Sequence, residues 1–379
     1  MEEQKIIQAE TKKRKGKRHF FNRIAMFSNH IAVIALLISY LAPNVSPDKF
    51  WFIAFFGLAY PLLVIINLLF IIYWALQIKK RAFYSSIVII AGFACLHNYV
   101  QFTFNNTPDT SKKLITIMSY NVKVFDLYNW SNNIETRKKM FELINSQSPE
   151  IACFQEYYQR DSSIYSNTDS LIKQNNFKYY HIEYTANAKN KQHFGIATFC
   201  NYPIINKGRV DFGYKSNNVC IYTDIICAKD TFRIYNMHLQ SIAFSKDDYK
   251  YIADLQNDVE SEDMARSKNI LKRLKRAFIK RAKQADIIEE SIASSPYPVI
   301  VCGDFNDTPA SYTRNTIGKN LSDAFVESGN GFGKSYTGKF PSFRIDYILH
   351  SNSFKAYNFR TIKEDLSDHY PVICYLQKQ

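Results

Sequence analysis

The fold is decided by the stretch Val299-Ile300-Val301-Cys302-Gly303-Asp304-Phe305-Asn306-Asp307-Thr308-Pro309. Its β-branched run lies between Pro298 and Gly303 and predicts a buried strand. Polar side chains follow at once, and sheet enzymes hold ligands just past the carboxyl ends of such strands. Asp304 and Asn306 could therefore orient a water molecule or a hard cation. The alternative is an Asp/Asn/Pro turn that only reverses the chain.

Length and charge leave room for more than one region. The chain has 379 residues and a formal net charge of +14, from 48 Lys and Arg against 34 Asp and Glu. Residues 1–110 carry twelve of these bases and five acids, so half of the excess lies there. The basic balance therefore bears on membrane topology as much as on an anionic partner.

The seven cysteines form no C-x-x-C pair and no Cys/His cluster at zinc spacing. Six of them lie in or beside strand-like apolar runs, namely Cys153, Cys200, Cys220, Cys227, Cys302 and Cys374. We expect small buried hydrophobic side chains at these positions. Cysteine usage does not fix the cellular compartment.

Residues 1–23 form a basic tail, and residues 24–100 are expected to form a transmembrane region of two to three helices. The apolar stretches Ile24–Ala42 and Phe50–Leu76 are long enough to cross a bilayer, whereas Ala82–Val100 is less apolar. A cleaved signal peptide is the alternative for the first stretch. No small-x-small cleavage site follows it and a second apolar stretch comes directly after, which favours an uncleaved anchor.

Positive charge sets the expected orientation. The tail and the link Lys79-Lys80-Arg81 are the basic segments, so both are placed in the cytoplasm. If the third stretch spans, the rest of the chain lies on the outer, periplasmic face of a multi-pass inner-membrane protein. If it does not, the rest is cytoplasmic. Residues 101–113 are the expected linker.

From Leu114 onward, short β-like runs alternate with turns and helical stretches, and most of these runs lead to a polar residue. The strand-like runs are Leu114–Tyr120, Ile151–Phe154, Gly195–Cys200, Val219–Cys227, Thr231–Tyr235, Val299–Gly303, Arg344–Leu349 and Val372–Tyr375. Thr136–Asn145 reads as a helix with one apolar face. The long segment Ser241–Glu290 carries a helical apolar stripe in its second half, with nine bases and no acid between Arg266 and Lys283. That basic face is either solvated or meets lipid headgroups or a polyanion.

Five strand ends present oxygen ligands or imidazoles: Asn121; Glu156; His238; Asp304 with Asn306; and Asp368 with His369. Asp346 begins a further strand. Any one of these residues alone would most simply be a turn residue or a hydrogen-bonded core residue. Their joint occurrence at strand ends favours a shared functional site. Oxygen ligands without sulfur suit Mg²⁺, or Mn²⁺, better than zinc. The set fits phosphate ester hydrolysis, in which a cation neutralises phosphoryl oxygens and side chains move protons.

In order, the motifs are Ser-Tyr-Asn121-Val, Phe-Gln-Glu156, Gly195-Ile-Ala, Asn236-x-His238-Leu, Gly303-Asp304-Phe-Asn306-Asp307, Arg344-Ile-Asp346-Tyr-Ile-Leu and Ser367-Asp368-His369-Tyr-Pro-Val. Together they resemble the endonuclease/exonuclease/phosphatase superfamily, in its deoxyribonuclease and sphingomyelinase branches, and suggest a membrane-anchored bacterial-type member. The resemblance spans about Leu114–Leu376. It implies an α/β fold: a four-layer sandwich of two mainly antiparallel sheets flanked by helices, with the catalytic domain over residues 114–379.

The resemblance also implies a role for each motif residue. The expected metal ligands are Asn121, Glu156 and Asp368, and Asn306 is the expected phosphate-binding residue. The expected catalytic residues are Asp304, which positions the nucleophilic water; His369, which stabilises the transition state; Asp346, which orients His369; and His238, which matches the histidine of the deoxyribonuclease and sphingomyelinase branches. Lys123 stands where abasic-site enzymes place an acidic metal-site residue, which points away from that branch. The sequence gives no carboxylate partner for His238, and Glu183 is not assigned to it.

Two substrate classes fit this chemistry. A lipid or other small phosphodiester fits the membrane tether and is favoured, with the lipid bilayer as a partner. Nucleic acid fits the basic balance, although the +7 carried by the catalytic region is modest. A catalytically inactive phosphate-binding domain is a third alternative. The sequence does not give the oligomeric state.

Overall fold

The computed structural model describes residues 2–103, 107–161, 165–188, 191–214, 216–242, 251, 263–338 and 343–379. The helices are α1 Glu2–Ser39, α2 Pro47–Leu58, α3 Tyr60–Ala75, α4 Ala82–Ala91, α5 Phe93–His97, the 3₁₀ turn η1 Lys123–Asp126, α6 Thr136–Gln147, α7 Asn167–Asn175, α9 Asp263–Ala293, α10 Tyr312–Ile317 and α11 Ala324–Ser328. The strands are β1 Gln101–Phe102, β2 Leu114–Asn121, β3 Ile151–Arg160, β4 Tyr179–Ala188, β5 Gln192–Cys200, β6 Ile204–Arg209, β7 Val219–Cys227, β8 Asp230–His238, β9 Val299–Asp304, β10 Ser322–Asp323, β11 Asn330–Gly331, β12 Asp346–His350, β13 Phe354–Thr361 and β14 Val372–Lys378.

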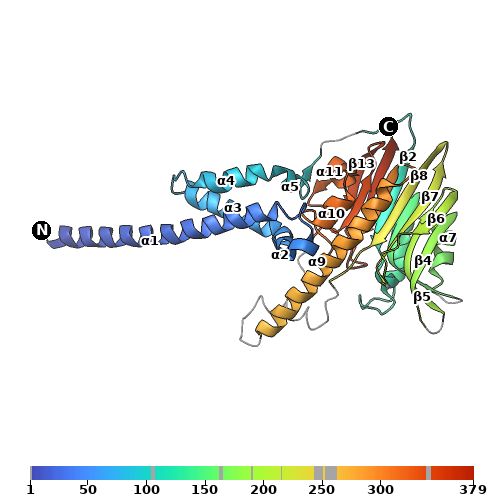
Figure 1. Cartoon of the computed structure of the whole chain (residues 1–379), viewed down its shortest axis with the longest axis horizontal. Coiled ribbons are helices and arrows are strands. Elements are labelled where there is room, and N and C mark those ends of the chain that lie inside the picture. Colours follow the sequence, from blue (N-terminus) through green and yellow to red (C-terminus); the bar gives the residue numbers. More distant parts are fainter. Residues whose placement is uncertain are drawn as a thin grey trace.

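Two six-stranded sheets form the centre of residues 114–379 (Figure 1). The first has the order β13-β14-β2-β3-β5-β4 and the second the order β10-β12-β9-β8-β7-β6. Each contains one parallel pair, β2 with β3 and β8 with β9, while its other pairs are antiparallel. The two strands of a parallel pair have their carboxyl ends on the same side of the sheet. Polar side chains that follow those strands are therefore brought together there.

The sheets pack face to face over apolar side chains that alternate along the strands. Ile117 and Cys153 of the first sheet and Ile234 and Ile300 of the second belong to this inner cluster. Helices α6 and α7 cover the outer face of the first sheet, and α9 and α10 cover that of the second. This is the expected α/β sandwich of two sheets flanked by helices. Among the described residues, six of the seven cysteines are buried and all are unpaired, as expected for small core side chains.

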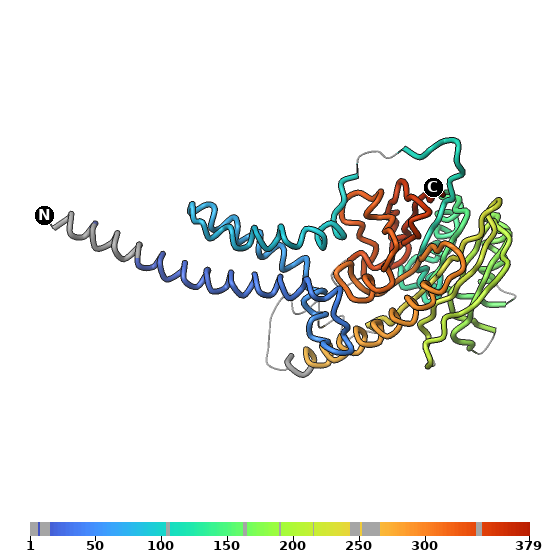
Figure 2. The backbone as a smooth tube through the Cα atoms, turned by 45° about the horizontal axis from the view of Figure 1, so that its top comes forward, coloured from blue at the N-terminus to red at the C-terminus, as the bar shows by residue number. Residues whose placement is uncertain are grey.

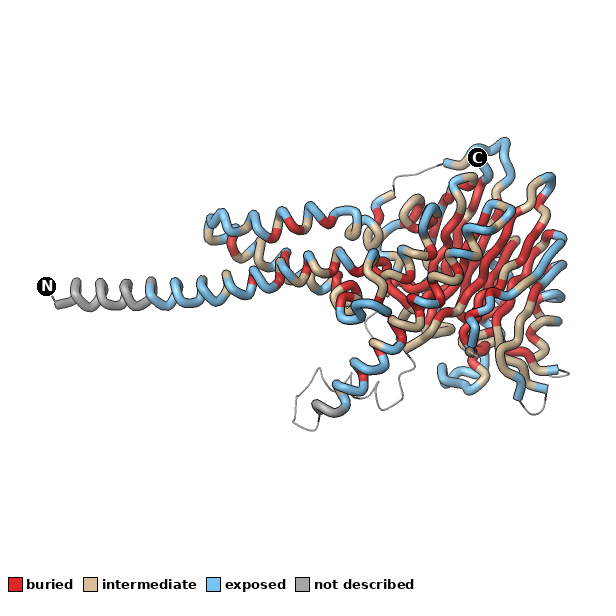
Figure 3. The backbone as a smooth tube through the Cα atoms, in the orientation of Figure 1, coloured by how far each residue is buried: buried red, intermediate tan, exposed pale blue. Residues whose placement is uncertain are grey.

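The helical region projects from one end of the sandwich, with α1 extending away from the sheets (Figure 2). Its helices expose many large apolar side chains, while the sandwich interior is buried (Figure 3). Within the described residues, one helical segment, Gly16–Ser39, is long and apolar enough to cross a membrane. The pair α2–α3, bent by 50°, would supply a second span if it acts as one.

The third apolar stretch, expected over Ala82–Val100, does not form one continuous helix. α4 ends at Ala91 after 10 residues, and α5 begins at Phe93. A bilayer-spanning helix needs about 20 residues, so α4 alone is too short. The number of spans and the side of the membrane on which residues 114–379 lie therefore stay predictions.

All eight predicted strands are present, and several of them are longer than predicted. The strand expected to end before Glu156 continues as β3 to Arg160. The expected linker 101–113 contains the short strand β1, which pairs with β11. Four further strands of the sheets were not predicted: β10 has only two residues, and β4, β6 and β13 carry mixed polar and apolar residues without a clear period. Much of the first half of the segment expected over Ser241–Glu290 lies outside the described residues.

Candidate active site

The organising stretch forms strand β9 as predicted, and its register fixes the first half of the site. His238 of β8 and Asp346 of β12 both lie opposite Asp304 in the ladders on either side. Gly303, one residue earlier, has φ +144°, and a Cβ atom there would lie 2.1 Å from the carbonyl oxygen of Met237. Only glycine lets the strand pass this close to β8. The stretch therefore places three titratable side chains in one row across the second sheet.

The first sheet supplies the facing half of the site. Asn121 ends β2, and Glu156 lies in an irregularity of β3 where the register shifts between Phe154 and Tyr157. Glu156 has φ +51°, a left-handed conformation that is uncommon for a non-glycine residue. The side-chain amide of Asn121 donates to Glu156 Oε1 at 3.3 Å and to Asp304 Oδ2 at 3.1 Å. Asn121 thus joins the polar ends of the two sheets by hydrogen bonds.

A buried amide pair joins the two sheets directly beneath these groups. Gln155 Nε2 donates to Asn236 Oδ1 at 2.7 Å, and Asn236 Nδ2 donates to the carbonyl oxygen of Ala197 at 2.9 Å. Both amide side chains are fully buried. Since Gln155 precedes Glu156 and Asn236 lies two residues before His238, the pair fixes the relative position of the two halves.

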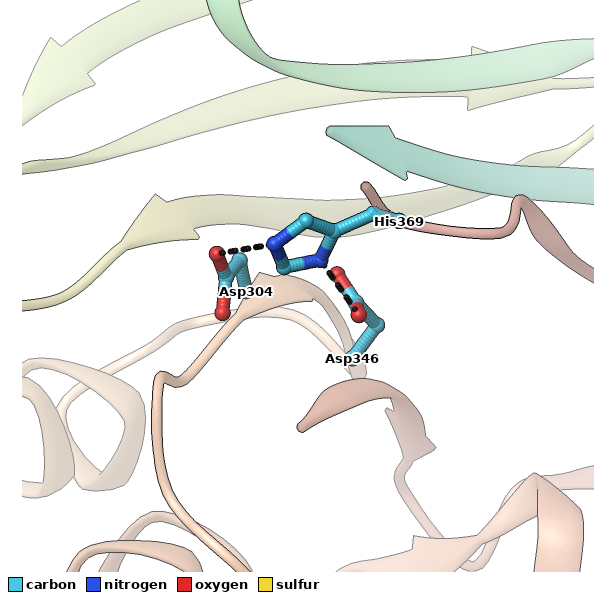
Figure 4. Close-up of side chains that lie close together, drawn as sticks. All are labelled: Asp304, Asp346 and His369. Atoms are coloured by element: carbon cyan, nitrogen blue, oxygen red, sulfur yellow. Dashed lines mark hydrogen bonds and ion pairs between the residues drawn. The ribbon is translucent and has the colours of Figure 1, made fainter. Parts of the chain in front are cut away.

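His369 lies between two carboxylates (Figure 4). Its Nδ1 is 2.9 Å from Asp346 Oδ2, and its Nε2 is 3.7 Å from Asp304 Oδ2. All three side chains are buried. The hydroxyl of Ser335 accepts hydrogen bonds from the backbone N–H groups of Ile345 and Asp346, which holds the start of β12 in place.

Burial and neighbouring charges shift the pKa values of His369 and Asp304. Burial favours the neutral imidazole of His369, but the carboxylates of Asp346 and Asp304 outweigh it and raise its pKa to about 10. Burial raises the pKa of the Asp304 carboxyl, with the His369 imidazole acting in the opposite direction. His369 is therefore an imidazolium at neutral pH, with both N–H groups directed at carboxylates.

The loop after β9 is tied down from several sides. Asn306, with φ +54°, donates its backbone N–H to Asp304 Oδ1 at 2.8 Å and its side-chain amide to the carbonyl oxygen of Leu239 at 3.1 Å. Asp307 Oδ2 accepts hydrogen bonds from Arg281 Nε of α9 at 3.0 Å and from Thr313 Oγ1 at 2.8 Å. These contacts hold the loop, and with it Asp304 and Asn306, in one conformation. A turn that only reversed the chain would not need them.

Sequence reasoning did not identify Arg281 as part of the site. Its side chain is 1% exposed, and it also donates to the carbonyl oxygen of Gln240. The residue lies one turn from Ala277 and Phe278 on the apolar stripe of α9. An arginine on the buried face of an amphipathic helix needs a buried acidic partner, and that rule could have pointed to Asp307.

Asp368 and Lys123 form the more open side of the site. Lys123 Nζ lies 3.0 Å from Asp368 Oδ2, and both side chains are about one-third exposed. The backbone N–H of Lys123 donates to Asn121 Oδ1 at 3.1 Å, and Ser367 Oγ donates to the carbonyl oxygen of Asn121. Lys123 thus contacts two of the three expected metal ligands, a contact that the sequence did not predict.

These groups surround one cleft with a volume of about 220 Å³. Six of the eight predicted site residues line it, namely Glu156, His238, Asp304, Asn306, Asp368 and His369. The other two predicted residues contact lining residues, Asn121 through Glu156 and Asp304, and Asp346 through His369. The structure therefore brings all eight predicted residues together.

His238 now has neighbouring carboxylates. Its Nε2 lies 3.6 Å from Asp304 Oδ2 and 3.8 Å from Glu156 Oε1. Glu183, which the sequence left unassigned, pairs instead with Arg209 at 3.4 Å. The imidazole of His238 therefore faces the same two carboxylates that Asn121 contacts.

Two groups of side chains contain atoms of the kind that ligate a divalent cation. Asp304, Asp346 and His369 offer ligand atoms that lie within 4.8 Å of one another. An imidazolium carries a proton on both ring nitrogens and cannot ligate a metal, however, so this trio suits proton transfer better. The carboxylates of Glu156 and Asp368 line the cleft, and the amide of Asn121, which contacts Glu156, is a third hard donor beside them. They suit Mg²⁺ or Mn²⁺ once the Asn121 amide presents its oxygen.

Comparison with known proteins places the catalytic region in a family. A family model described as the endonuclease/exonuclease/phosphatase family matches residues 118–369. A second model, for a domain of unknown function (DUF8431), matches residues 22–99. No curated protein sequence matches the chain.

Solved structures share the fold at low sequence identity. An endonuclease/exonuclease/phosphatase family protein from Bacteroides thetaiotaomicron is 17% identical, with a TM-score of 0.51, and the alignment covers 71% of this chain and 99% of that one. A Bacteroides vulgatus protein is 16% identical, with a TM-score of 0.50 and coverage of 71% and 100%. The human Nocturnin catalytic domain, solved with a bound sulfate anion, is 17% identical, with a TM-score of 0.50 and coverage of 72% and 100%.

Proposed function

The chain belongs to the endonuclease/exonuclease/phosphatase family, and on that premise we propose that it is a divalent-metal-dependent hydrolase of phosphodiesters. Members of this superfamily are hydrolases that act on phosphoesters. The observation that carries the proposal is the single cleft lined by Glu156, Asp304 and His369. Two carboxylates and one imidazole from distant parts of the chain meet there. Residues that served only in turns would have no reason to converge.

The proposed reaction adds one water molecule to a phosphodiester. The water oxygen forms a new bond to phosphorus, the bond from phosphorus to the leaving alcohol breaks, and a phosphomonoester and an alcohol result. Asp304 accepts the proton of the attacking water, and its raised pKa suits a general base. The leaving oxygen takes up a proton from solvent and Asp304 returns its proton to solvent, so charge and atoms balance.

The other side chains hold and stabilise the phosphoryl group. The His369 imidazolium, held by Asp346, donates toward the phosphoryl oxygens as negative charge builds on them. Asn306 is fixed by the carbonyl oxygen of Leu239 and is positioned to bind a phosphoryl oxygen. His238, beside Asp304 and Glu156, donates to a second oxygen.

Asn121, Glu156 and Asp368 would hold Mg²⁺ or Mn²⁺, which neutralises phosphoryl oxygens and stabilises the leaving oxyanion when bound. Lys123 contacts Asp368 and adds a fixed positive charge on the same side of the cleft. A cation and a lysine together would offset the charges of Glu156 and Asp368 and of an anionic substrate.

We propose a membrane-anchored enzyme acting on a lipid or other small phosphodiester, in the manner of a sphingomyelinase. The apolar helix Gly16–Ser39 supports the anchor, and the proposed location is the inner membrane, with the catalytic region on its periplasmic face. Cleavage of nucleic acid is the second candidate, and the exposed bases of α9 are the observation that favours it. A catalytically inactive phosphate-binding domain is the third.

Hydrolysis of bis(p-nitrophenyl) phosphate by the full-length protein in detergent tests the proposal. We expect activity that needs Mg²⁺ or Mn²⁺, that stops with EDTA, and that is lost in Asp304→Ala and His369→Ala. Thermal unfolding of each variant checks that it is folded. Activity that EDTA leaves intact, or that both variants retain, would overturn the proposed function.

A further inference from the structure

The cleft has two chemically different walls. One carries Asp304, His369 and Glu156 of the proposed catalytic and metal site. The other, the apolar wall, is formed by Leu58, Ile242 and Phe278, which pack in one hydrophobic cluster. A phosphodiester whose two alcohols are both polar gains no binding free energy from the apolar wall. An amphiphilic phosphodiester can bury its apolar portion against that wall.

Part of the apolar wall comes from the N-terminal helical region. Leu58 is the last residue of α2, directly before the bend into α3, and it packs with Phe55 against a cluster that contains Leu274 and Phe278 of α9. The rings of Phe55 and Phe278 meet edge to face with centroids 5.2 Å apart. The helical region is therefore a component of the cleft as well as an expected anchor.

The helical region is also attached firmly to the catalytic loop. A Cβ atom on Gly57 would lie 2.6 Å from the carbonyl oxygen of Ala310, so α2 lies directly against the residue that follows Pro309. The backbone N–H of Ala310 donates to the hydroxyl of Tyr99 at 3.2 Å. These contacts hold the apolar wall at a fixed position relative to the loop that carries Asp304.

A second link joins the two regions beside β12. Arg344 is 2% exposed; it donates to Asp323 Oδ2 at 2.9 Å and to the carbonyl oxygen of Asn98 at 2.9 Å. The bond from this buried arginine to the carbonyl oxygen of Asn98 crosses the boundary and resists separation of the two regions. We therefore treat Leu58 as a stable part of the cleft wall.

The surroundings of α2 match a lipid–water boundary. Phe50, Trp51 and Phe52 at its start are 54%, 39% and 46% exposed. Lys275 of α9 lies over the Trp51 ring at 4.4 Å, and α9 exposes further bases beside it, Lys268, Lys272 and Arg276. Aromatic side chains next to a row of cations are typical of the headgroup level of a leaflet.

We propose that the cleft takes a lipid phosphodiester from the leaflet in which the helical region sits, with the apolar portion of the lipid lying against Leu58 and Phe278 and its phosphate facing Asp304. This inference rests on the proposed hydrolase function and names its substrate class. The cationic face of α9 would lie against the anionic headgroups of the same leaflet. The N-terminal region thus determines specificity, because it forms one wall of the substrate site.

The test compares two substrates for the full-length protein reconstituted in vesicles. One is soluble bis(p-nitrophenyl) phosphate. The other is vesicle lipid, with phosphatidylcholine as the matrix and sphingomyelin, phosphatidylinositol or phosphatidylglycerol added in turn, followed by release of the water-soluble product. We expect one of these lipids to be hydrolysed and Leu58→Gln to lower the ratio of lipid to soluble-ester activity by about tenfold, the usual effect of impairing an apolar substrate contact.

Matched variants separate specificity from damage to the fold. Ile205→Gln makes a similar change on β6, where the side chain is 50% exposed and remote from the cleft, and should leave the ratio unchanged. Leu58→Met keeps an apolar side chain and should keep the ratio close to that of the wild type.

Each other outcome counts against a defined statement. Soluble-ester hydrolysis without cleavage of any lipid, an unchanged ratio in Leu58→Gln, or cleavage of plasmid DNA with the lipids left intact would overturn the lipid inference and leave the hydrolase function standing. Absence of all hydrolysis, with the soluble ester included, would overturn both.

Discussion

The two halves of the cleft satisfy their charges in different ways. In one half, Asp346 and Asp304 of the second sheet lie on either side of His369. All three side chains are buried, and the His369–Asp346 contact measures 2.9 Å. On the side of the first sheet, the side chains of Glu156 and Asp368 are 38% and 31% exposed. The Asn121–Glu156 contact there is longer, at 3.3 Å.

This difference indicates a division of tasks. A buried imidazolium held by a carboxylate is preorganised to stabilise the negative charge that develops on the phosphoryl oxygens. Exposed carboxylates with long contacts keep oxygen lone pairs free for a cation and its water shell. We therefore expect changes on the His369 side to alter the chemical step and changes on the Glu156 side to alter the metal requirement.

The largest effect should follow from Asp304→Asn, because this carboxylate contacts both halves. It loses the proposed general base and the partner of His369 in one change. We expect kcat on the soluble phosphodiester to fall by about 10⁴, the upper range for a positioned acid or base. A fall of less than about tenfold would remove Asp304 from the role of base.

The next largest effect is expected from His369→Ala and Asp346→Asn, which change only the buried half. We expect kcat to fall by about 10²–10³ for His369→Ala and by less for Asp346→Asn, since the asparagine still occupies the site beside the ring. The Mg²⁺ concentration that gives half-maximal activity should stay near that of the wild type. A large rise in that concentration would place the cation among these residues instead.

Glu156→Gln should act on the open half. The variant keeps the shape of the side chain but loses its charge, so we expect the half-maximal Mg²⁺ concentration to rise about tenfold or more, with smaller loss of kcat at saturating metal. Metal titrations of the wild type and the variant measure both quantities. A loss of kcat with no change in metal requirement would contradict the division of tasks.

The smallest effect is expected from Lys123→Met. Its ion pair with Asp368 is partly exposed, and pairs of this kind contribute up to about 1 kcal/mol. We expect a change in activity of up to about fivefold, and tighter Mg²⁺ binding because Asp368 loses a competing cation. Weaker metal binding in this variant would show that Lys123 positions Asp368 for the cation.

The sequence was sufficient for the parts of the site that depend on strand ends. Asp304, His238 and Asp346 fall in one register row because each lies at the end or the start of a strand whose apolar pattern was readable. The motif order then brought the other predicted residues to the same edge. The two-sheet sandwich follows from the same pattern, because each apolar run needs a partner face.

The sequence was not sufficient where geometry depends on packing between distant segments. The continuation of β3 past Glu156 requires a left-handed residue within a strand, which no local propensity favours. The contact of Lys123 with Asp368 and that of Leu58 with the cleft join residues far apart in the chain. No periodicity encodes such pairs, so only the folded structure could reveal them.

The most direct test of the division of tasks is Mn²⁺ binding followed by electron paramagnetic resonance on the full-length protein. We predict one bound ion per chain, lost or greatly weakened in Glu156→Gln and retained in Asp346→Asn. The contrary result, an ion retained in Glu156→Gln and lost in Asp346→Asn, would place the metal in the buried half and contradict the account.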